Sequence, residues 1–297
     1  MDDVMTPEHA RALARLRAAW GRMDGLAVLV TGATRGIGLE TARQLARLGA
    51  DVLVHGRDAD RGAAALAAVQ AASGPSAAPA LYLADLSAAA GVRDLAAAVR
   101  HDRPRLAALV DNAGVFSPER RVTADGLELI FAVNVVAPIL LAAELLPVLR
   151  AAAPSRIVMV SSASHWTGEL HWDDLQFAGP GVWDAVAAYD QSKLAVTMLT
   201  LELAHRLRDS GITAVCLDPG DVATRMLALG WPDLPGIPVE SGAVTSVYLA
   251  SAPQAGGLSG VYVEDGRPVE PPPAALDPKA RARLWREVER VCGPLRV

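Results

Sequence analysis

Short runs of β-branched and other apolar residues alternate along the chain with longer, alanine-rich stretches of helical spacing. Apolar runs bounded by turn formers are typical of buried strands, whereas apolar positions that recur every third or fourth residue indicate amphipathic helices. Strands are therefore expected over residues 26–31, 51–55, 80–84, 106–111, 156–161, 212–217 and 260–264. Helices are expected near residues 36–49, 58–72, 88–100, 124–150, 188–210 and 239–250.

This regular alternation predicts an α/β fold with a doubly wound, parallel, seven-stranded sheet, because parallel strands need crossover helices that cover both faces. A single domain is expected over residues 23–270. Residues 1–22 would form a helical extension, capped by Thr6, opened by Pro7 and apolar along Leu13, Leu16 and Trp20. Residues 271–297 would form a proline-rich turn and a last helix over 277–291.

Neither a membrane span nor a secretion signal is expected. The most apolar stretch, Val133 to Leu149, contains Pro138, Glu144 and Pro147 and is shorter than the ~20 apolar residues that cross a bilayer. It is interpreted as a buried helix. The first twenty residues carry acids and arginines instead of a basic segment followed by an apolar one, which argues against a signal peptide.

Composition narrows the functional classes further. The chain has 297 residues, 52% of them hydrophobic, which is enough for a sizeable core. Its net charge of −5 lacks the basic excess that binding to nucleic acid requires. The two cysteines, Cys216 and Cys292, form no CxxC pair, so neither a disulfide framework nor a thiolate zinc cluster is expected, and no other metal site is predicted. A cytoplasmic location fits this cysteine usage best.

A glycine-rich turn, TGATRGIG, follows the first expected strand and leads directly into a helix. Glycines permit a tight turn and a close approach of the backbone, and the N–H groups at a helix N-terminus attract a pyrophosphate. In a βαβ unit this context predicts a Rossmann-type dinucleotide site. The residues expected to line it are Gly32, Thr34, Arg35, Gly36, Ile37 and Gly38.

The end of the second strand indicates which dinucleotide binds. Arg57 stands where an acidic residue would hold a ribose 2′-hydroxyl, and its guanidinium, with that of Arg35, suits a 2′-phosphate. NADP(H) is therefore favoured over NAD(H). Asp58 offers the alternative of a ribose clamp in an NAD enzyme, although its position before the next helix favours a capping role.

Candidate proton-transfer groups lie in the second half of the chain. Tyr189 and Lys193 are four residues apart, which places both on one face of a helix. A fixed ammonium group favours the phenolate and should lower the pKa of the tyrosine. Ser162 ends the fifth strand at the edge of the sheet where ligands of parallel sheets bind, and Ser161 should point to the opposite face.

These motifs, in this order, resemble the short-chain dehydrogenase/reductase family from about Leu26 to Val263. Within the family the segment HWDDLQ, the 27-residue interval from Ser162 to Tyr189 and the tail ARLWREVERVCG are similar to retinol dehydrogenase-like and WW-domain-oxidoreductase-like members. The matching motifs are TGATRGIG, Asp85-Leu86, Asn112-Ala113-Gly114, Asn134, Ser162, Tyr189-x-x-x-Lys193 and Pro219-Gly220.

The resemblance implies roles for each matching residue. Tyr189 would exchange a proton with the substrate oxygen, Lys193 would tune it and hold the nicotinamide ribose, Ser162 would hydrogen-bond the substrate, and Asn134 would anchor a water. Cofactor contacts are implied at Asp85, Leu86, Asn112, Ala113, Gly114, Pro219, Gly220, Val222 and Thr224. The sequence departs from the family pattern at Asp111, where many members have asparagine, and in the long interval before Tyr189.

The resulting hypothesis is an NADP(H)-dependent oxidoreductase that interconverts a carbonyl and an alcohol. A catalytically idle nucleotide-binding protein is the alternative, but the complete set of Tyr189, Lys193 and Ser162 argues against it. A sugar-nucleotide epimerase is disfavoured because little chain follows Pro219 to form a separate substrate domain.

Aromatic residues near the expected site indicate a hydrophobic substrate. They would line an apolar pocket or else pack the loops onto the body of the protein. The resemblance also implies a homodimer or homotetramer, formed through the helices over 124–150 and 188–210. The pocket candidates are Trp166, Trp172, Phe177, Trp183, Met226 and Trp231.

Overall fold

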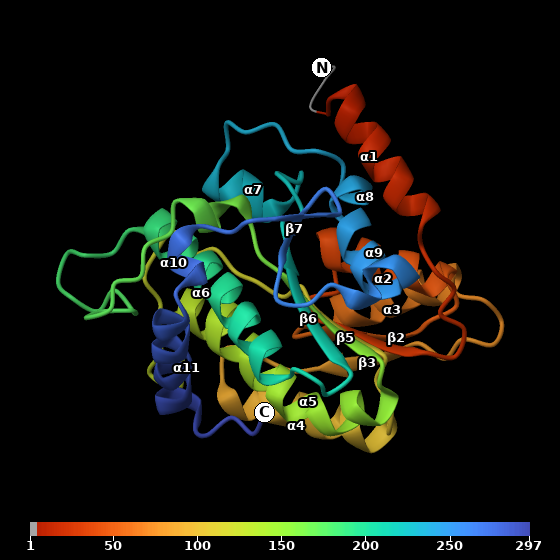
Figure 1. Cartoon of the computed structure of the whole chain (residues 1–297), viewed down its shortest axis with the longest axis horizontal. Coiled ribbons are helices and arrows are strands. Elements are labelled where there is room, and N and C mark those ends of the chain that lie inside the picture. The colour runs from red at the N-terminus through yellow and green to blue at the C-terminus, as the bar shows by residue number, and fades with distance from the viewer. Residues whose placement is uncertain (1–4) are drawn as a thin grey trace.

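The computed structural model describes residues 5–297, and its centre is one eight-stranded sheet (Figure 1). The strands are β1 (Ala27–Val30), β2 (Asp51–Gly56), β3 (Ala80–Leu83), β4 (Ala108–Asp111), β5 (Ser155–Val160), β6 (Ile212–Leu217), β7 (Tyr262–Glu264) and β8 (Arg267–Val269). Their spatial order is β3-β2-β1-β4-β5-β6-β7-β8. All seven expected strands are present and parallel.

The expected strand count of seven was one short, because β8 pairs antiparallel with β7 at the edge of the sheet. Asp265 and Gly266 join the two strands with positive φ angles of 47° and 73°, which is the geometry of a two-residue hairpin turn. The short β8 contains Pro268, which an edge strand tolerates but which breaks the apolar pattern by which strands are recognised.

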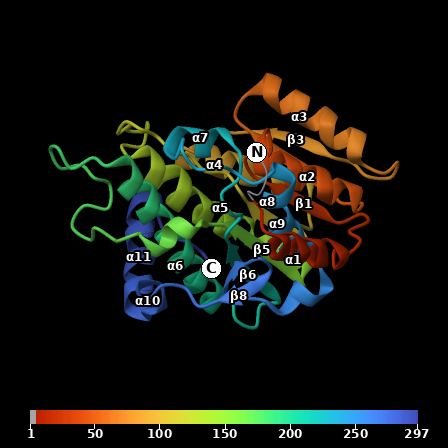
Figure 2. The ribbon, with the colours of Figure 1, turned by 90° about the horizontal axis from the view of Figure 1, so that it is seen from above.

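Helices cover both faces of the sheet, as the alternating pattern predicts. α4, α5, α6 and α11 enclose one core, and α2, α3 and α9 enclose the other. Figure 2 shows α10 and α11 at one end of the molecule and α3 at the other. The helices are α1 (Pro7–Ala18), α2 (Gly36–Arg47), α3 (Ala59–Ala72), α4 (Ala89–Asp102), α5 (Ala137–Ala152), α6 (Ala185–Arg206), α7 (Arg225–Gly230), α8 (Val239–Gly242), α9 (Val244–Ser251), α10 (Pro273–Leu276) and α11 (Pro278–Cys292).

The helix expected from residue 124 begins later, after Glu128. Gly126 has a φ of +77° in a turn, and the Glu128 carboxylate accepts hydrogen bonds from the amides of Ile130 (2.8 Å) and Phe131 (2.7 Å). A π-helical turn, Phe131–Val136, then leads into α5. The continuous helix Phe131–Ala152 has a mean hydropathy of 2.1 and is long and apolar enough to cross a membrane, but 89% of its apolar window is buried inside the fold.

Both chain extensions pack on this body. Thr6 caps α1 by accepting from the amide of His9 (3.1 Å), and the buried Leu13 and Leu16 of α1 lie against α9. At the other end α11 lies beside α6 (Figure 1), with Trp285 fully buried and the Arg206 guanidinium 4.2 Å from the centre of its ring. α10 and α11 therefore cover one side of the helix that carries Tyr189 and Lys193.

Candidate active site

A cavity of about 460 Å³ lies at the carboxyl edge of the sheet, where the strand order reverses between β1 and β4. Open α/β sheets bind ligands at this point. The cavity collects residues that are far apart in sequence. Those predicted from the sequence that line it are Gly32, Thr34, Arg35, Gly36, Ile37, Gly38, Arg57, Asp85, Leu86, Asn112, Ala113, Gly114, Tyr189, Lys193, Pro219 and Thr224.

The other predicted residues stand behind or beside the cavity. Val222 is buried and pairs with Ile237 in an isolated bridge, and Gly220 turns the chain with a φ of +79°. Ser162 lies beside Tyr189, and Asn134 contacts Ser192, the residue before Lys193. Among residues 5–297, no group of three or more His, Cys, Asp or Glu side chains could hold a metal ion.

The glycine-rich loop needs its glycines because it packs tightly on the turn after β4. Gly32 has a φ of +64°, and a Cβ atom there would lie 2.9 Å from the Cα of Ala113. A Cβ atom at Gly38 would lie 2.6 Å from the carbonyl oxygen of Gly32. The next helix, α2, begins at Gly36 without a side-chain cap, so its first N–H groups are available to an anion.

Thr31 ties this loop to the turn after β4. Its hydroxyl donates to Asp111 Oδ1 (2.7 Å) and accepts from the amides of Asn112 (3.0 Å) and Ala113 (2.9 Å). The Asn112 side-chain amide returns a hydrogen bond to the Thr31 carbonyl (2.9 Å). The two walls of the cavity are therefore fixed relative to each other by one buried threonine.

Asp111, the departure from the family pattern, is a buried carboxyl group in this network. Its Oδ2 atom has no hydrogen-bond partner among residues 5–297. Burial raises the pKa of Asp111 to about 6, although the Thr31 hydroxyl and the charge of Lys193 oppose that rise. Asp111 therefore places a titratable charge within electrostatic reach of Lys193, where asparagine would be neutral.

Four arginines, Arg35, Arg57, Arg61 and Arg225, gather at the end of the cavity away from Lys193. The Arg35 guanidinium is partly buried and is repelled by Arg225, Arg61 and Arg57, and both effects lower its pKa. Arg61 pairs with Asp58 (3.2 Å), whose carboxylate also caps α3, as expected, by accepting from the Arg61 amide (2.9 Å). Among residues 5–297, Arg35, Arg57 and Arg225 form no ion pair, so this end of the cavity suits a phosphate.

Sequence reasoning found Arg35 and Arg57 but missed Arg61 and Arg225. It also missed His55, which connects the glycine loop to β3. The His55 ring accepts from the Gly32 amide (3.2 Å) and contacts the carbonyl of Ala84 (3.2 Å). Burial lowers the pKa of His55 to about 4, so the ring is neutral at physiological pH. A histidine within an otherwise apolar strand was the available signal.

Tyr189 and Lys193 lie in α6, which begins after Asp184 caps the amides of Val186 and Ala187 (both 2.9 Å). Both side chains are buried, and the Lys193 Nζ atom is 5.4 Å from the centre of the Tyr189 ring. Lys193 donates to the carbonyl of Val160 (3.1 Å). The predicted pair is therefore brought together at the edge of the sheet.

The expectation that the lysine would lower the pKa of the tyrosine is not met. The pKa of Tyr189 is raised, first by burial and then by the negative charge of Asp218, while a hydrogen bond from Ser162 lowers it. Burial also lowers the pKa of Lys193 to about 8, against the opposing charges of Asp111 and Asp218. The desolvation of both groups outweighs their mutual influence.

The two serines after β5 point in different directions, but Ser161, and not the expected Ser162, is among the residues that line the cavity. Ser162 lies near the Tyr189 hydroxyl and caps a short 3₁₀ turn, Ala163–Trp166, by accepting from the amide of Ser164 (3.2 Å). The Ser161 hydroxyl instead points into α6, where it donates to the Lys193 carbonyl (3.1 Å) and contacts the Thr197 hydroxyl (3.1 Å). Ser162 therefore faces the tyrosine, and Ser161 anchors the helix.

Asn134 lies in the π-helical turn, and its side chain joins two segments of the site. Its Oδ1 accepts from the Val115 amide (2.8 Å), and its Nδ2 donates to the Val115 carbonyl (3.0 Å) and the Ser192 hydroxyl (3.1 Å). These bonds hold the segment after β4 against α6 beside Lys193. Single π-helical turns within helices are frequent at functional sites.

Asp218 is a site residue that sequence reasoning passed over, although it directly precedes the Pro219-Gly220 motif. Its carboxylate accepts from the Gly220 amide (3.0 Å), and burial raises its pKa to about 6. As noted above, its charge raises the pKa of both Tyr189 and Lys193. It therefore opposes deprotonation of both reactive groups.

Aromatic side chains pack around Tyr189, but they are not all those expected. The Trp231 and Phe116 ring centres lie 5.2 Å and 5.9 Å from that of Tyr189, and the Met226 sulfur accepts from its hydroxyl (3.5 Å). Phe116 was missed because a lone phenylalanine in a loop gives no pattern. Together these side chains surround the Tyr189 ring with apolar atoms, and Met226 is the one of the three that lines the cavity.

The aromatic residues of the long insert pack elsewhere, as the alternative interpretation held. Phe177 is buried and meets Trp183 edge-on at 6.1 Å. Trp172 lies 4.2 Å from the Arg283 guanidinium of α11, and Trp166 is exposed. Apart from Trp166, these rings pack the segment between Ser162 and Tyr189 onto itself and onto α11.

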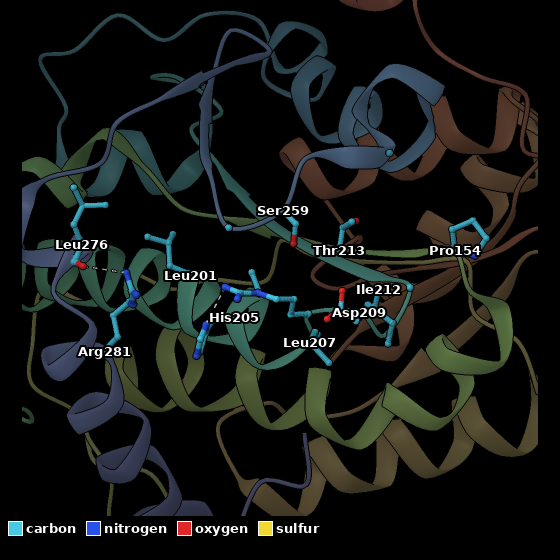
Figure 3. Close-up of a pocket in the computed structure, with 15 residues that line it drawn as sticks. Pro154, Leu201, His205, Leu207, Asp209, Ile212, Thr213, Ser259, Leu276 and Arg281 are labelled. Carbon is cyan, nitrogen blue, oxygen red and sulfur yellow. Dashed lines mark hydrogen bonds between the residues drawn. The ribbon is translucent and has the colours of Figure 1, made fainter.

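A second cavity, of about 650 Å³, lies at the opposite edge of the sheet (Figure 3). It is formed between the end of α6, the start of β6 and α10, where Arg281 donates to the carbonyl of Leu276 (3.2 Å). It contains none of the predicted site residues.

Comparison with known proteins identifies the family. The family model described as short chain dehydrogenase matches residues 8–174 and 176–233. The chain belongs to the short-chain dehydrogenase family. It is an oxidoreductase that interconverts carbonyl and alcohol groups, and within the family it falls in the retinol dehydrogenase-like subgroup.

Three relatives illustrate the similarity. Mouse polyprenol dehydrogenase is 39% identical, covering 91% of this chain and 84% of the relative. Human retinol dehydrogenase 14 is 36% identical, covering 93% and 89%. The crystal structure of a short-chain dehydrogenase from Burkholderia cenocepacia in complex with NADP superimposes with a TM-score of 0.67 at 27% identity, covering 82% and 98%.

The buried Asp111 carboxyl group generates a prediction about stability. Its pKa is higher in the folded protein than in the unfolded chain, so the folded state binds more protons between about pH 4 and pH 6 and loses stability as the pH rises through this range. Asp111→Asn keeps an acceptor for Thr31 and removes the charge. The variant should match the original protein at pH 4 and exceed its unfolding free energy by up to about 3 kcal/mol at pH 7.

Urea unfolding of both proteins across this pH range measures the difference. Asp94→Asn, at an exposed position of α4, is the matched control and should leave the pH dependence unchanged. A difference between Asp111→Asn and the original protein that is the same at pH 4 and pH 7 would show that charge burial is not its cause.

Proposed function

We propose that this short-chain dehydrogenase uses NADP(H), with Tyr189 as the general acid and base, on a hydrophobic carbonyl or alcohol. The observation that carries the proposal is that a single cavity has different chemical groups at its two ends. Unpaired arginines lie at one end, and the buried Tyr189 and Lys193 lie at the other. A catalytically idle protein would have no need to keep two costly buried polar groups together at the edge of the sheet.

The residues at the phosphate end fit a phosphorylated dinucleotide. The uncapped start of α2 suits a pyrophosphate, and the guanidinium groups of Arg35 and Arg57 suit a 2′-phosphate. Asp58, the residue that would favour NAD(H), is occupied by the cap of α3 and by Arg61. The NADP bound in the Burkholderia structure supports the same choice.

At the other end, the chain's own groups are arranged to move a proton. The nicotinamide, when bound, supplies or accepts the hydride. Because the pKa of Tyr189 is raised, its hydroxyl carries a proton at neutral pH, as a donor to a carbonyl oxygen must. Ser162 lies beside this hydroxyl and would orient the substrate oxygen. Lys193, with a pKa lowered to about 8, would return the proton to Tyr189.

The apolar surroundings of Tyr189 support a hydrophobic substrate. Phe116, Trp231 and Met226 surround the Tyr189 ring, so a polar substrate would lose hydration there without gaining partners. The names of the polyprenol and retinol dehydrogenases among the relatives point to long apolar alcohols. A screen of apolar ketones, aldehydes and alcohols with NADPH and NADP⁺ tests this proposal.

The arginine cluster generates a prediction about cofactor choice. Arg57→Asp removes a charge-assisted contact and sets an anion against the 2′-phosphate. We expect the kcat/KM with NADPH to fall at least about a hundred-fold, while that with NADH changes little. Arg15→Asp, on the exposed side of α1, is the control for the change of charge. Equal efficiency of NADH and NADPH in the original protein would refute the preference.

The arrangement of the reactive groups generates a second prediction. Tyr189→Phe keeps the ring between Phe116 and Trp231 and removes only the hydroxyl, so NADPH should still bind while turnover falls by ~10²- to 10⁴-fold. Lys193→Ala should weaken both turnover and NADPH binding, and Ser162→Ala mainly turnover. Steady-state kinetics and NADPH fluorescence titration separate these effects. Near-normal turnover in Tyr189→Phe would mean that another group carries the proton.

Association into a homodimer or homotetramer is also proposed. α10 and α11 cover one side of α6, so an interface through α5 and α6 would have to use the parts of these helices that the tail leaves exposed. Light scattering at micromolar protein should give at least twice the mass of 31.0 kDa. A monomer would indicate that the tail replaces the partner subunit.

A cytoplasmic location remains part of the proposal. Its support is the cysteine usage, because Cys216 and Cys292 are both buried and unpaired. Such thiols persist most readily in a reducing compartment.

A further inference from the structure

Two backbone hydrogen bonds join the two ends of the segment between β6 and α8, and these joined ends are called its base. The Ala223 amide donates to the Ile237 carbonyl (2.9 Å), and the Ile237 amide donates to the Asp221 carbonyl (2.7 Å). A Cβ atom at Gly236 would meet the backbone of Ala223, so the two chain segments of the base are in close contact. Beyond this base lies α7, which has no buried residue. Little packing energy therefore holds the start of α7 in place, whereas Trp231 at its end packs against the Phe116 and Tyr189 rings (5.3 Å and 5.2 Å between ring centres).

The side chain of Met226, the second residue of α7, lies among the reactive groups. Its sulfur accepts from the Tyr189 hydroxyl (3.5 Å), and its methyl group is 3.8 Å from the Cβ position of Gly114. The Lys193 Nζ atom is 3.9 Å from that same position. Met226 thus accepts the hydrogen bond that the Tyr189 hydroxyl would otherwise donate to a substrate oxygen. A thioether is a weak acceptor, so an oxygen can displace it.

The residue before Met226 faces the opposite end of the cavity. Arg225 lies close enough to Arg35 to repel it, and among residues 5–297 it forms no ion pair. Thr224, which caps α7, has its methyl group 3.5 Å from the Cβ position of Gly36 in the glycine loop. Neighbouring residues of one short helix therefore contact the phosphate end and the reactive end of the same cavity.

We propose that Met226 masks the Tyr189 hydroxyl and that Arg225 removes this mask by turning toward a phosphate bound at the glycine loop. A phosphate between Arg35 and Arg225 replaces their repulsion with attraction to a common anion. Arg225 then moves toward the loop, α7 follows because none of its residues is fully buried, and Met226 leaves Tyr189. The substrate site would thus open only after the dinucleotide binds. This inference rests on the proposed NADP(H) function.

The position of Met226 can be followed without turnover. The chain has six methionines, and ¹³C-methyl labelling gives each a separate NMR signal. Met226→Leu assigns the signal of interest, which the rings of Tyr189, Phe116 and Trp231 should shift strongly. Signals of the buried Met159 and Met198 serve as internal controls.

The probe is 2′,5′-ADP, which carries both adenosine phosphates but no nicotinamide. At saturation it should shift the Met226 signal toward that of a methionine away from aromatic rings and leave Met159 and Met198 unchanged. Arg225→Gln should bind 2′,5′-ADP more weakly and, once saturated, show no such shift. Arg286→Gln, on the exposed side of α11, is the matched control and should behave like the original protein.

Each other outcome overturns the inference. If Met226 moves only with complete NADP⁺, the nicotinamide displaces it directly and Arg225 transmits nothing. If 2′,5′-ADP moves Met226 equally in Arg225→Gln, another residue carries the coupling. Binding of 2′,5′-ADP without any Met226 shift refutes the inference alone, whereas failure to bind 2′,5′-ADP or NADP⁺ refutes the NADP(H) function as well.

Kinetics give an independent measurement. At saturating NADPH the original protein has already lost the Met226 contact, so Met226→Ala alone should leave the KM for an apolar ketone nearly unchanged. In Arg225→Gln the contact should persist with NADPH bound, so adding Met226→Ala to this variant should lower the KM roughly five-fold, which is the value of one weak hydrogen bond. A KM that Met226→Ala leaves unchanged in the Arg225→Gln protein would show that the Met226 contact does not compete with substrate.

Discussion

The burial of the Lys193 ammonium group is the constraint on which the rest of the site depends. A buried cation is costly unless opposite charge lies nearby, and here that charge comes from Asp111 at the end of β4 and Asp218 at the end of β6. Asp111 is buried and Asp218 is partly buried, and the pKa values of both are raised to about 6. The site is thus a set of three titratable groups on neighbouring elements, in which the ammonium group and the carboxylates favour one another's charged forms while burial opposes them.

This set explains why Tyr189 keeps its proton. A tyrosine beside a lysine in water would lose its proton more easily, but here burial and the charge of Asp218 act in the opposite direction. In the proposed mechanism, a protonated tyrosine is the form that can donate to a carbonyl oxygen. The same hydroxyl, when it meets no substrate oxygen, donates to Met226, which links the proton donor to the mobility of α7.

Much of the fold could be predicted because it follows from local pattern. Apolar runs such as Val52–Val54 are recognisable as strands wherever they occur, and their alternation with helices leaves few topologies. The edge strand β8 could not be found, because Pro268 interrupts its pattern and only pairing with β7 makes it a strand. Site residues with motifs around them, such as Tyr189, were found. Residues without a surrounding motif, such as Arg225, were missed, because only the fold brings Arg225 near Arg35.

The pKa of Tyr189 shows a second limit of sequence reasoning. Spacing reveals that Lys193 is near, but the degree of burial depends on the whole fold, including the tail that packs Trp285 against α6. α6 is held on one side by the sheet and on another by α10 and α11, so its two reactive side chains are fixed in a dry environment. α7, in contrast, buries nothing. On the proposed function, rigid proton-transfer groups beside a movable α7 would let the site exclude water during reaction and still admit an apolar substrate.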